Sequence, residues 1–316
     1  MKKFLLKFVL TFSFLVIALF LMDFLIVEGL KTSNYREITK WNDVVSGKVE
    51  TDVLIVGSSR ALVHFDCELF EKIVGTSCYN LGFNGTNLTQ QIKMLQLFLR
   101  KNNSPKKIIW SLDYHMFENR EQFFGFDQLI PFMAEKEIKE LVQMNNIDEP
   151  WLYNFPVARF SFNRKMKLVG LNNLLGFYKN GRPLIKGFIG EDKGWDGEFE
   201  LIRAKAKEQL YYKVDQESKK SFLEIIDFIQ SQDIEIEFVI SPIYYELNEF
   251  AENEDEIKKE FRTLAETYDI KLYDFSEDEI GRDRQYFYNS LHLNLKGVSK
   301  FNQLYYYSLI QKSNLD

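Results

Sequence analysis

The peptide Asp52-Val53-Leu54-Ile55-Val56-Gly57-Ser58-Ser59-Arg60 carries the clearest structural signal in this sequence. Its four apolar residues are mostly β-branched and end at a Gly-Ser-Ser turn, which is typical of a strand buried on both faces of a parallel sheet. Gly57 allows the chain to turn sharply because it has no Cβ atom. The peptide therefore predicts a buried strand ending at Val56, with the hydroxyl of Ser59 directly beyond that end.

Helices and strands alternate on both sides of a less regular middle section. Before it, the pattern predicts a helix over 66–74 with Asp66 as its N-cap, a strand over 77–81, a helix over 86–99 and a strand over 107–112. After it come a helix over 217–230, a strand over 234–240, a helix over 254–268, a strand over 270–275 and a helix over 293–310. This alternation predicts an α/β fold, with a mostly parallel sheet and helices on both faces. Ligands bind such sheets beyond the carboxyl ends of the strands, here after Val56, Leu81, Leu112 and Ile240.

Composition excludes several classes of protein. The 316 residues are 46% hydrophobic and 27% charged, so the chain is not disordered and has ample material for a core. The net charge of −6 argues against general nucleic-acid binding, which needs a basic face. Two Cys and three His argue against a disulfide-rich scaffold and a histidine-based metal centre. Because the sequence also has no glycine-rich phosphate loop and no metal-ligand spacing, we expect no bound cofactor.

The N-terminus is apolar from Phe4 to Val27, with Lys7 and Asp23 near the ends of the segment. That length spans a bilayer if both charged side chains reach toward the interfaces. Lys2, Lys3 and Lys7 place the N-terminus in the cytoplasm, and hence the bulk of the chain outside it. A cleaved signal peptide is the rival, but no small-residue cleavage site follows the segment. A core helix is disfavoured because the segment is apolar on all faces. We therefore expect a single-pass signal anchor over 1–30.

Two further regions follow the anchor, and the second contains an insertion. Residues 31–50 are polar and of mixed charge, which predicts a stalk, and residues 51–316 form the α/β domain. From about 117 to 212 the regular pattern is lost, so we expect an insertion or lid there. Cys67 and Cys78 flank one short predicted helix. Outside the cytoplasm they could form a disulfide, with two buried free thiols as the alternative.

Ser59 and His292 are the candidate nucleophile and base. A hydroxyl at the end of a strand, near the first turn of a helix, lies where backbone N–H groups can stabilise an oxyanion. The peptide Asn289-Ser290-Leu291-His292 stands far along the chain, just before the last predicted helix. A serine nucleophile needs such an imidazole within hydrogen-bond reach. Capping serines at a turn and a structural histidine are the alternatives.

The order of these motifs resembles the SGNH, or GDSL-like, hydrolase superfamily. Gly57-Ser58-Ser59 matches its first motif, Asn80-Leu81-Gly82-Phe83-Asn84-Gly85 its second, and Asn289-Ser290-Leu291-His292 its last. The resemblance covers most of 51–112 and 217–310. It implies a flavodoxin-like sheet, Ser59 as nucleophile, Gly85 with the Ser59 N–H in the oxyanion hole, and His292 as catalytic base. The anchored layout is similar to the branch that includes alginate O-acetylation enzymes and the lipoteichoic-acid D-alanylation protein.

Three positions depart from the pattern of that superfamily. Ser58 stands where its Asp usually is, and the third motif, Gly-x-Asn-Asp, is missing. By position His115 falls at the oxyanion asparagine, and an imidazole N–H could donate there instead. Asn289 replaces the aspartate of the catalytic pair: its amide can accept from the imidazole but does not favour the imidazolium. Asp113 and Asp274, near predicted strand ends, are candidates for a replacement carboxylate.

These features lead to two main hypotheses of function. The first is a membrane-anchored extracytoplasmic serine esterase or O-acyltransferase acting on an acylated cell-envelope glycan or polymer, with a membrane acyltransferase as a candidate partner. Arg60 is then a candidate for holding an anionic group of the substrate, and Tyr244 and Tyr245 for stacking on sugar rings. The second, motivated by Asn289 and the missing motif, is a degenerate hydrolase fold that binds a glycan or partner protein. A membrane-tethered scaffold is the weakest alternative.

Overall fold

The computed structural model describes residues 1–119, 125–144, 155–160, 163–177 and 184–313. The chain divides into two compact units, Met1–Val45 with Gly125–Pro183, and Ser46–Phe124 with Leu184–Asp316. The insertion predicted over 117–212 is thus shared between them. Its parts at 120–124, 145–154, 161–162 and 178–183 lie outside the described residues.

The first unit is helical and contains the apolar N-terminal helix. Among the described residues its elements are α1 (Lys2–Lys31), most of α2 (Arg36–Ser46), η1 (Phe126–Phe132), α6 (Lys136–Met144), η3 (Ala158–Phe160) and α7 (Arg164–Leu174). The predicted stalk over 31–50 is largely helical, since α2 occupies most of it. Helix α1 is long and apolar enough to cross a membrane, and most of its apolar part is exposed.

The second unit contains a five-stranded parallel sheet, which confirms the predicted fold class. Its strands are β1 (Val53–Val56), β2 (Cys78–Asn80), β3 (Lys107–Ser111), β4 (Glu235–Ile240) and β5 (Lys271–Asp274). They are arranged in the order β2-β1-β3-β4-β5, and every neighbouring pair is parallel. This is the flavodoxin-like order, which reverses direction at β1 and β3 and opens a crevice beyond their carboxyl ends. Ser59 follows β1 directly and so lies at that edge.

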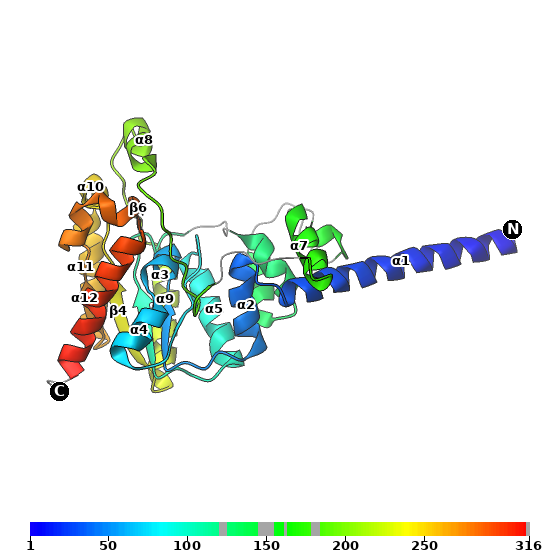
Figure 1. Ribbon diagram of the computed structural model, residues 1–316, viewed down its shortest axis with the longest axis horizontal. Helices are drawn as coiled ribbons and strands as arrows, with labels where there is room; N and C mark the ends of the chain where they lie inside the picture. The colour runs from blue at the N-terminus through cyan, green and yellow to red at the C-terminus, as the bar shows by residue number, and fades with distance from the viewer. Residues whose placement is uncertain (120–124, 145–154, 161–162, 178–183, 314–316) are drawn as a thin grey trace. The chain divides into compact units, whose positions relative to one another are not determined.

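Helices cover both faces of this sheet (Figure 1). The α-helices described in this unit are α3 (Ser59–His64), α4 (Cys67–Val74), α5 (Leu88–Lys101), α8 (Glu198–Lys205), α9 (Gln216–Ser231), α10 (Tyr245–Phe250), α11 (Glu254–Thr267) and α12 (Leu295–Ser313), of which α8 projects away from the sheet. Trp110 and Phe238 are register partners, and both pack on Phe222 of α9. Tyr273 pairs with Val239, one residue further on, so its side chain points to the opposite face and contacts Tyr305 of α12.

Short elements near the C-terminus hold the second half of the candidate site. The helices η4 (Glu279–Arg282) and η5 (Arg284–Tyr286) lead into an antiparallel pair, β6 (Phe287–Asn289) and β7 (His292–Leu293). The sequence predicts His292 just before a helix; it lies in β7, and α12 begins three residues later. Asn289 and His292 are register partners across the turn, which brings their side chains together.

Cys67 and Cys78 form a disulfide in this structure. The bond joins the first residue of α4 to the first residue of β2. Of the two alternatives that the sequence leaves open, this is the disulfide rather than the pair of free thiols. It ties the segment after the Ser59 helix to the neighbouring strand, and the described part of the chain has no free cysteine.

Candidate active site

Ser59 is presented at the carboxyl end of β1 by a tight strand-to-helix turn. Gly57 has a φ of +153°, and a Cβ atom there would lie 2.8 Å from the Ala61 Cβ and 3.0 Å from the Ser111 Cβ. Only glycine fits this close approach, as the sequence predicts. Ser58 is the N-cap of α3, where its side chain accepts from the Arg60 N–H. Ser59 is thereby the first residue of α3 and is half-buried.

The structure brings Ser59, His292 and Asn289 together in a hydrogen-bonded row. The Ser59 Oγ lies 2.7 Å from the His292 Nε2, and the His292 Nδ1 lies 2.9 Å from the Asn289 Oδ1. A serine and its base need a separation of about 2.6–3.2 Å. The two residues are 233 positions apart in the sequence, and the end of β1 and the β6–β7 turn meet at this point.

The backbone fixes which way the Asn289 amide points. Its Oδ1 accepts hydrogen bonds from the backbone N–H groups of Leu291, at 3.1 Å, and His292, at 3.0 Å. Both donors require an oxygen, so the amide oxygen and not its NH₂ group faces the imidazole. The His292 Nδ1 therefore carries the proton and donates it to Asn289. The Nε2 is left with its lone pair directed at the Ser59 hydroxyl, which is the tautomer a general base needs.

His292 is a weakly basic imidazole. Burial, followed by the positive charge of Arg60, lowers its pKa from the ordinary value to about 4, and the negative charge of Asp113 opposes only part of this shift. His115 contributes in the same direction as Arg60. Asn289 supplies no charge to oppose these effects. His292 is consequently neutral at physiological pH and ready to accept a proton, but the imidazolium that would form gains little stabilisation.

A buried polar network lies behind Ser59 and His292. Arg60 is only 2% exposed and forms an ion pair with Asp113 at 3.3 Å. Its guanidinium also donates to the carbonyls of Leu112 and Ser241 and, at 2.9 Å, to the Ser241 Oγ. These partners follow β3 and β4, so Arg60 ties the first turn of α3 to the ends of two other strands. Removing one partner of such a buried pair typically costs about 3–5 kcal/mol.

His64 extends this network to the strand that carries His292. The backbone N–H of Leu293 donates to the His64 Nε2 at 3.0 Å, so the proton of this imidazole is on Nδ1, which lies 2.7 Å from the Ser241 Oγ. Complete burial, followed by the charge of Arg60, lowers the pKa of His64 well below its ordinary value. His64 is therefore a neutral structural residue, and it positions β7 against α3.

Two expectations about substrate contacts are corrected by this geometry. Arg60 is not free to hold an anionic substrate group, because its guanidinium is enclosed by Asp113, Leu112 and Ser241. Tyr244 is also buried, and its ring contacts Trp195 at 4.8 Å. Its ring is therefore part of the packed interior beside the site and is not exposed for stacking on a sugar ring. Tyr245 is half-buried and keeps its predicted role only as a hypothesis.

The candidate replacement carboxylates do not occupy the place of the missing aspartate. Asp113 pairs with Arg60, and Asp274 accepts from the N–H and hydroxyl of Ser276. The group bonded to the His292 Nδ1 is Asn289.

The oxyanion hole has three candidate donors. Gly85 lies in an exposed turn after β2 with a φ of +67°, and in the same turn the Phe83 N–H donates to the Gly57 carbonyl. His115 is half-buried. The oxyanion roles of Ser59, Gly85 and His115 stay predictions.

Sequence reasoning missed the contacts that the segment 184–197 makes around this site. Its backbone donates from Ile189 to Leu62 of α3 and from Asp196 to Tyr288 of β6, and its Glu191 accepts from Leu295 of α12. The Tyr288 ring stacks on His292, 5.3 Å between centroids and 6° from parallel. The sequence predicts an irregular insertion here. These contacts are made by single backbone groups, so no hydrophobic periodicity in the sequence predicts them.

Tyr244 belongs to a cluster of aromatic and charged side chains centred on Arg284. The Arg284 guanidinium lies 5.0 Å from the Trp195 ring and 5.2 Å from the Tyr244 ring. It also pairs with Glu200 at 2.7 Å and Glu246 at 2.9 Å. Tyr244 donates to Glu246, and this bond, followed by the charge of Arg284, lowers the pKa of Glu246. The cluster locks α8, α10 and η5 together, which supports the β6–β7 pair.

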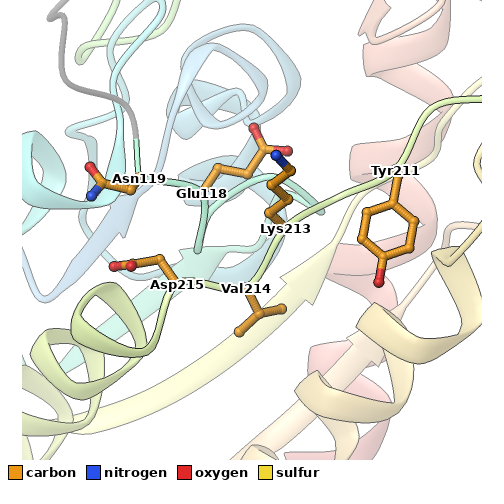
Figure 2. Close-up of a pocket in the computed structure, with 6 residues that line it drawn as sticks. All are labelled: Glu118, Asn119, Tyr211, Lys213, Val214 and Asp215. Atoms are coloured by element: carbon orange, nitrogen blue, oxygen red, sulfur yellow. The ribbon is translucent and has the colours of Figure 1, made fainter.

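A separate cavity of about 430 Å³ lies between the segment after β3 and the segment leading into α9. Figure 2 shows its lining residues, which are Glu118, Asn119, Tyr211, Lys213, Val214 and Asp215. None of the predicted site residues lines it. The cavity is open at the surface and its lining residues carry both charges. Because none of them belongs to the Ser59–His292 site, the cavity is not part of that site.

Comparisons with known proteins leave the family of this chain open. No family model and no curated protein matches the sequence. Among solved structures, one that matches is described as "a putative platelet activating factor from Streptococcus pneumonia", at 13% identity and a TM-score of 0.37, covering 94% of this chain and 99% of that one. At that level of similarity it contributes nothing to the assignment, which rests on the geometry of the site.

Proposed function

We propose that this protein is a membrane-anchored serine esterase or O-acyltransferase that acts outside the cytoplasm on an acylated cell-envelope glycan or polymer. The single observation that carries the proposal is the 2.7 Å contact between the Ser59 Oγ and the unprotonated Nε2 of His292. The resemblance of the three motifs to the SGNH hydrolases and the long apolar helix α1 agree with it.

The proposed reaction has two halves with the same proton path. The Ser59 Oγ attacks the acyl carbonyl while its proton passes to the His292 Nε2, and the Ser59 and Gly85 N–H groups, with His115, stabilise the oxyanion. The C–O bond to the leaving alcohol then breaks, and that alcohol takes the proton from His292. Water or a sugar hydroxyl next gives its proton to His292 and attacks the acyl-serine. The C–O bond to Ser59 then breaks, the Ser59 Oγ takes the proton back from His292, and an acid or a new ester is released.

Covalent labelling with a fluorophosphonate tests this proposal. The full chain in detergent is expected to form a phosphonyl ester on Ser59 with loss of fluoride, since the probe needs an activated serine. The Ser59→Ala variant should take up no probe. Ser58→Ala is the matched control: Ser58 is adjacent and buried, but its hydroxyl faces the Arg60 N–H, so labelling should persist. A folded wild-type chain that takes up no probe contradicts the proposal.

The degenerate-fold hypothesis keeps one observation in its favour, which is the uncharged Asn289 at the His292 Nδ1. On that hypothesis the crevice binds a glycan or partner protein without turnover. Complementation of a deletion strain separates the two: Ser59→Ala restores the cellular phenotype if the protein only binds, and fails to restore it if Ser59 is the nucleophile.

A further inference from the structure

We propose that helix α7 and the turn after it, Leu174–Phe177, lie in the headgroup layer of the membrane that α1 crosses, as a second contact with lipid. This proposal concerns the first unit alone. It rests on α1 as a membrane span and not on the chemistry of Ser59.

Apolar side chains of this segment are exposed in the structure. Leu168, Leu174, Leu175 and Phe177 are all exposed, and Leu175 retains 65% of its surface. Met166, Val169 and Gly170 are the buried residues of α7. At 100° per residue they lie on one side of the helix, whereas Leu168 and Leu175 lie on the other. A concentrated apolar surface of this kind marks a contact with a membrane or a protein.

The position of α7 along α1 favours the membrane as its partner. Figure 1 shows α7 lying against the C-terminal part of α1, and the two helices make extensive contact. They cross at glycines: a Cβ atom on Gly29 would lie 1.9 Å from the Gly170 carbonyl oxygen, and one on Gly170 would lie 2.4 Å from the Ile26 carbonyl oxygen. Asn173 donates to the Gly29 carbonyl at 3.0 Å.

Depth in the bilayer follows from the helical rise. If the span ends near Asp23, Ile26 and Gly29 lie about 5–9 Å beyond it at about 1.5 Å per residue. The headgroup layer is about 5–7 Å thick on each side of the hydrocarbon core. Asp23 itself accepts from Arg159 and from the Val157 N–H, so the chain leading to α7 is fixed at the end of the span. The point where α7 crosses α1 therefore runs from within the headgroup layer, at Ile26, to just beyond its outer edge, at Gly29.

Charge on the same helix agrees with a lipid surface. Arg164, Lys165 and Lys167 fall in the first turns of α7, and the helix has no acidic residue. Segments that lie in membrane interfaces combine exposed leucine and phenylalanine with such basic residues, which attract anionic lipid. The basic end and the exposed leucines together commit the proposal to a lipid surface that includes anionic headgroups.

Spin labels on single cysteines test the proposal in the full chain. Since Cys67 and Cys78 are bonded, an introduced cysteine is the reactive thiol. The labels go on Leu175→Cys, on Phe14→Cys in α1 and on Phe228→Cys in α9, in vesicles of phosphatidylcholine and phosphatidylglycerol. Leu174→Cys gives a matched pair with Phe228→Cys, because the native side chains are 44% and 45% exposed.

Collision rates with oxygen, which partitions into lipid, and with a water-soluble nickel chelate give the result. We expect labels at 14, 174 and 175 to favour oxygen several-fold over the label at 228. If the label at 14 favours oxygen but the labels at 174 and 175 have the same collision rates as the label at 228, α7 faces water. The proposal then fails, although α1 still spans the membrane. If 174 and 175 are shielded from both reagents, protein covers α7 and the proposal also fails. If 14 favours the chelate, the span itself is refuted.

Discussion

Ser59→Ala is expected to lower the rate of ester hydrolysis by about 10³- to 10⁶-fold, measured as kcat/KM on a small aryl ester. The reason is that the Ser59 Oγ is the only hydroxyl bonded to the His292 Nε2 among the described residues. His292→Ala should cause a similar loss, because the two groups act as one unit. The double variant should then be little worse than either single variant.

Stability provides the control for these variants. Ser59 is half-buried and caps nothing, so Ser59→Ala should leave the thermal unfolding midpoint within a few degrees of the wild type. A Ser59→Ala protein that unfolds like the wild type and hydrolyses the ester at the same rate would contradict the assignment of the nucleophile. Loss of activity together with loss of cooperative unfolding calls for His292→Gln as a second variant that conserves volume.

Asn289→Asp is expected to raise kcat/KM by about 10- to 1,000-fold at neutral pH. A carboxylate at this position can accept the same backbone N–H bonds from Leu291 and His292, so the geometry is retained. Its negative charge stabilises the imidazolium that forms as Ser59 loses its proton. The gain should be smaller than the about 10⁴-fold effect of the reverse change in the serine-protease triad. There the wrong tautomer contributes, whereas here Asn289 already sets the right one.

The pH profile separates this effect from a structural one. Catalysis needs neutral His292, so activity is present above the pKa of this group and is lost as pH falls through it. In the wild type that pKa is lowered to about 4, and activity should persist to about pH 4–5. In Asn289→Asp the carboxylate raises the pKa of His292, so the acidic limb should move upward. An unshifted limb with no gain in rate would contradict the role given to Asn289.

The fold was accessible from sequence because it depends on local patterns, whereas the pairing of Ser59 with His292 was expected from the order of the motifs and their resemblance to the SGNH hydrolases. The run Val53–Val56 ending at Gly57 predicts a buried strand and a turn, and the structure has both. The alternation of helices and strands predicts the parallel sheet, and the separate β6–β7 pair brings His292 to Ser59 beyond the end of β1. The turn Asn289–His292 is short enough for its two side chains to meet, although its strand character was not foreseen.

The remainder of the site depends on contacts between distant segments, which leave no periodic signal. Arg60 reads as an exposed charge next to a nucleophile until Asp113 and Ser241 are known to converge on it from two other strands. Tyr244 reads as a loop aromatic, yet Trp195 and Arg284 enclose it. The segment 184–197 has no hydrophobic periodicity because backbone hydrogen bonds, rather than an apolar face, hold it against the sheet unit.

The acyl-enzyme is the species that tests the central claim most directly. The full chain is mixed with an activated aryl ester, quenched in acid within the first turnover, and digested for peptide mass spectrometry. The account predicts one acyl group on the peptide that contains Ser59 and none in the Ser59→Ala protein. A wild-type chain that unfolds cooperatively but carries no acyl group on Ser59, at any quench time, would contradict it.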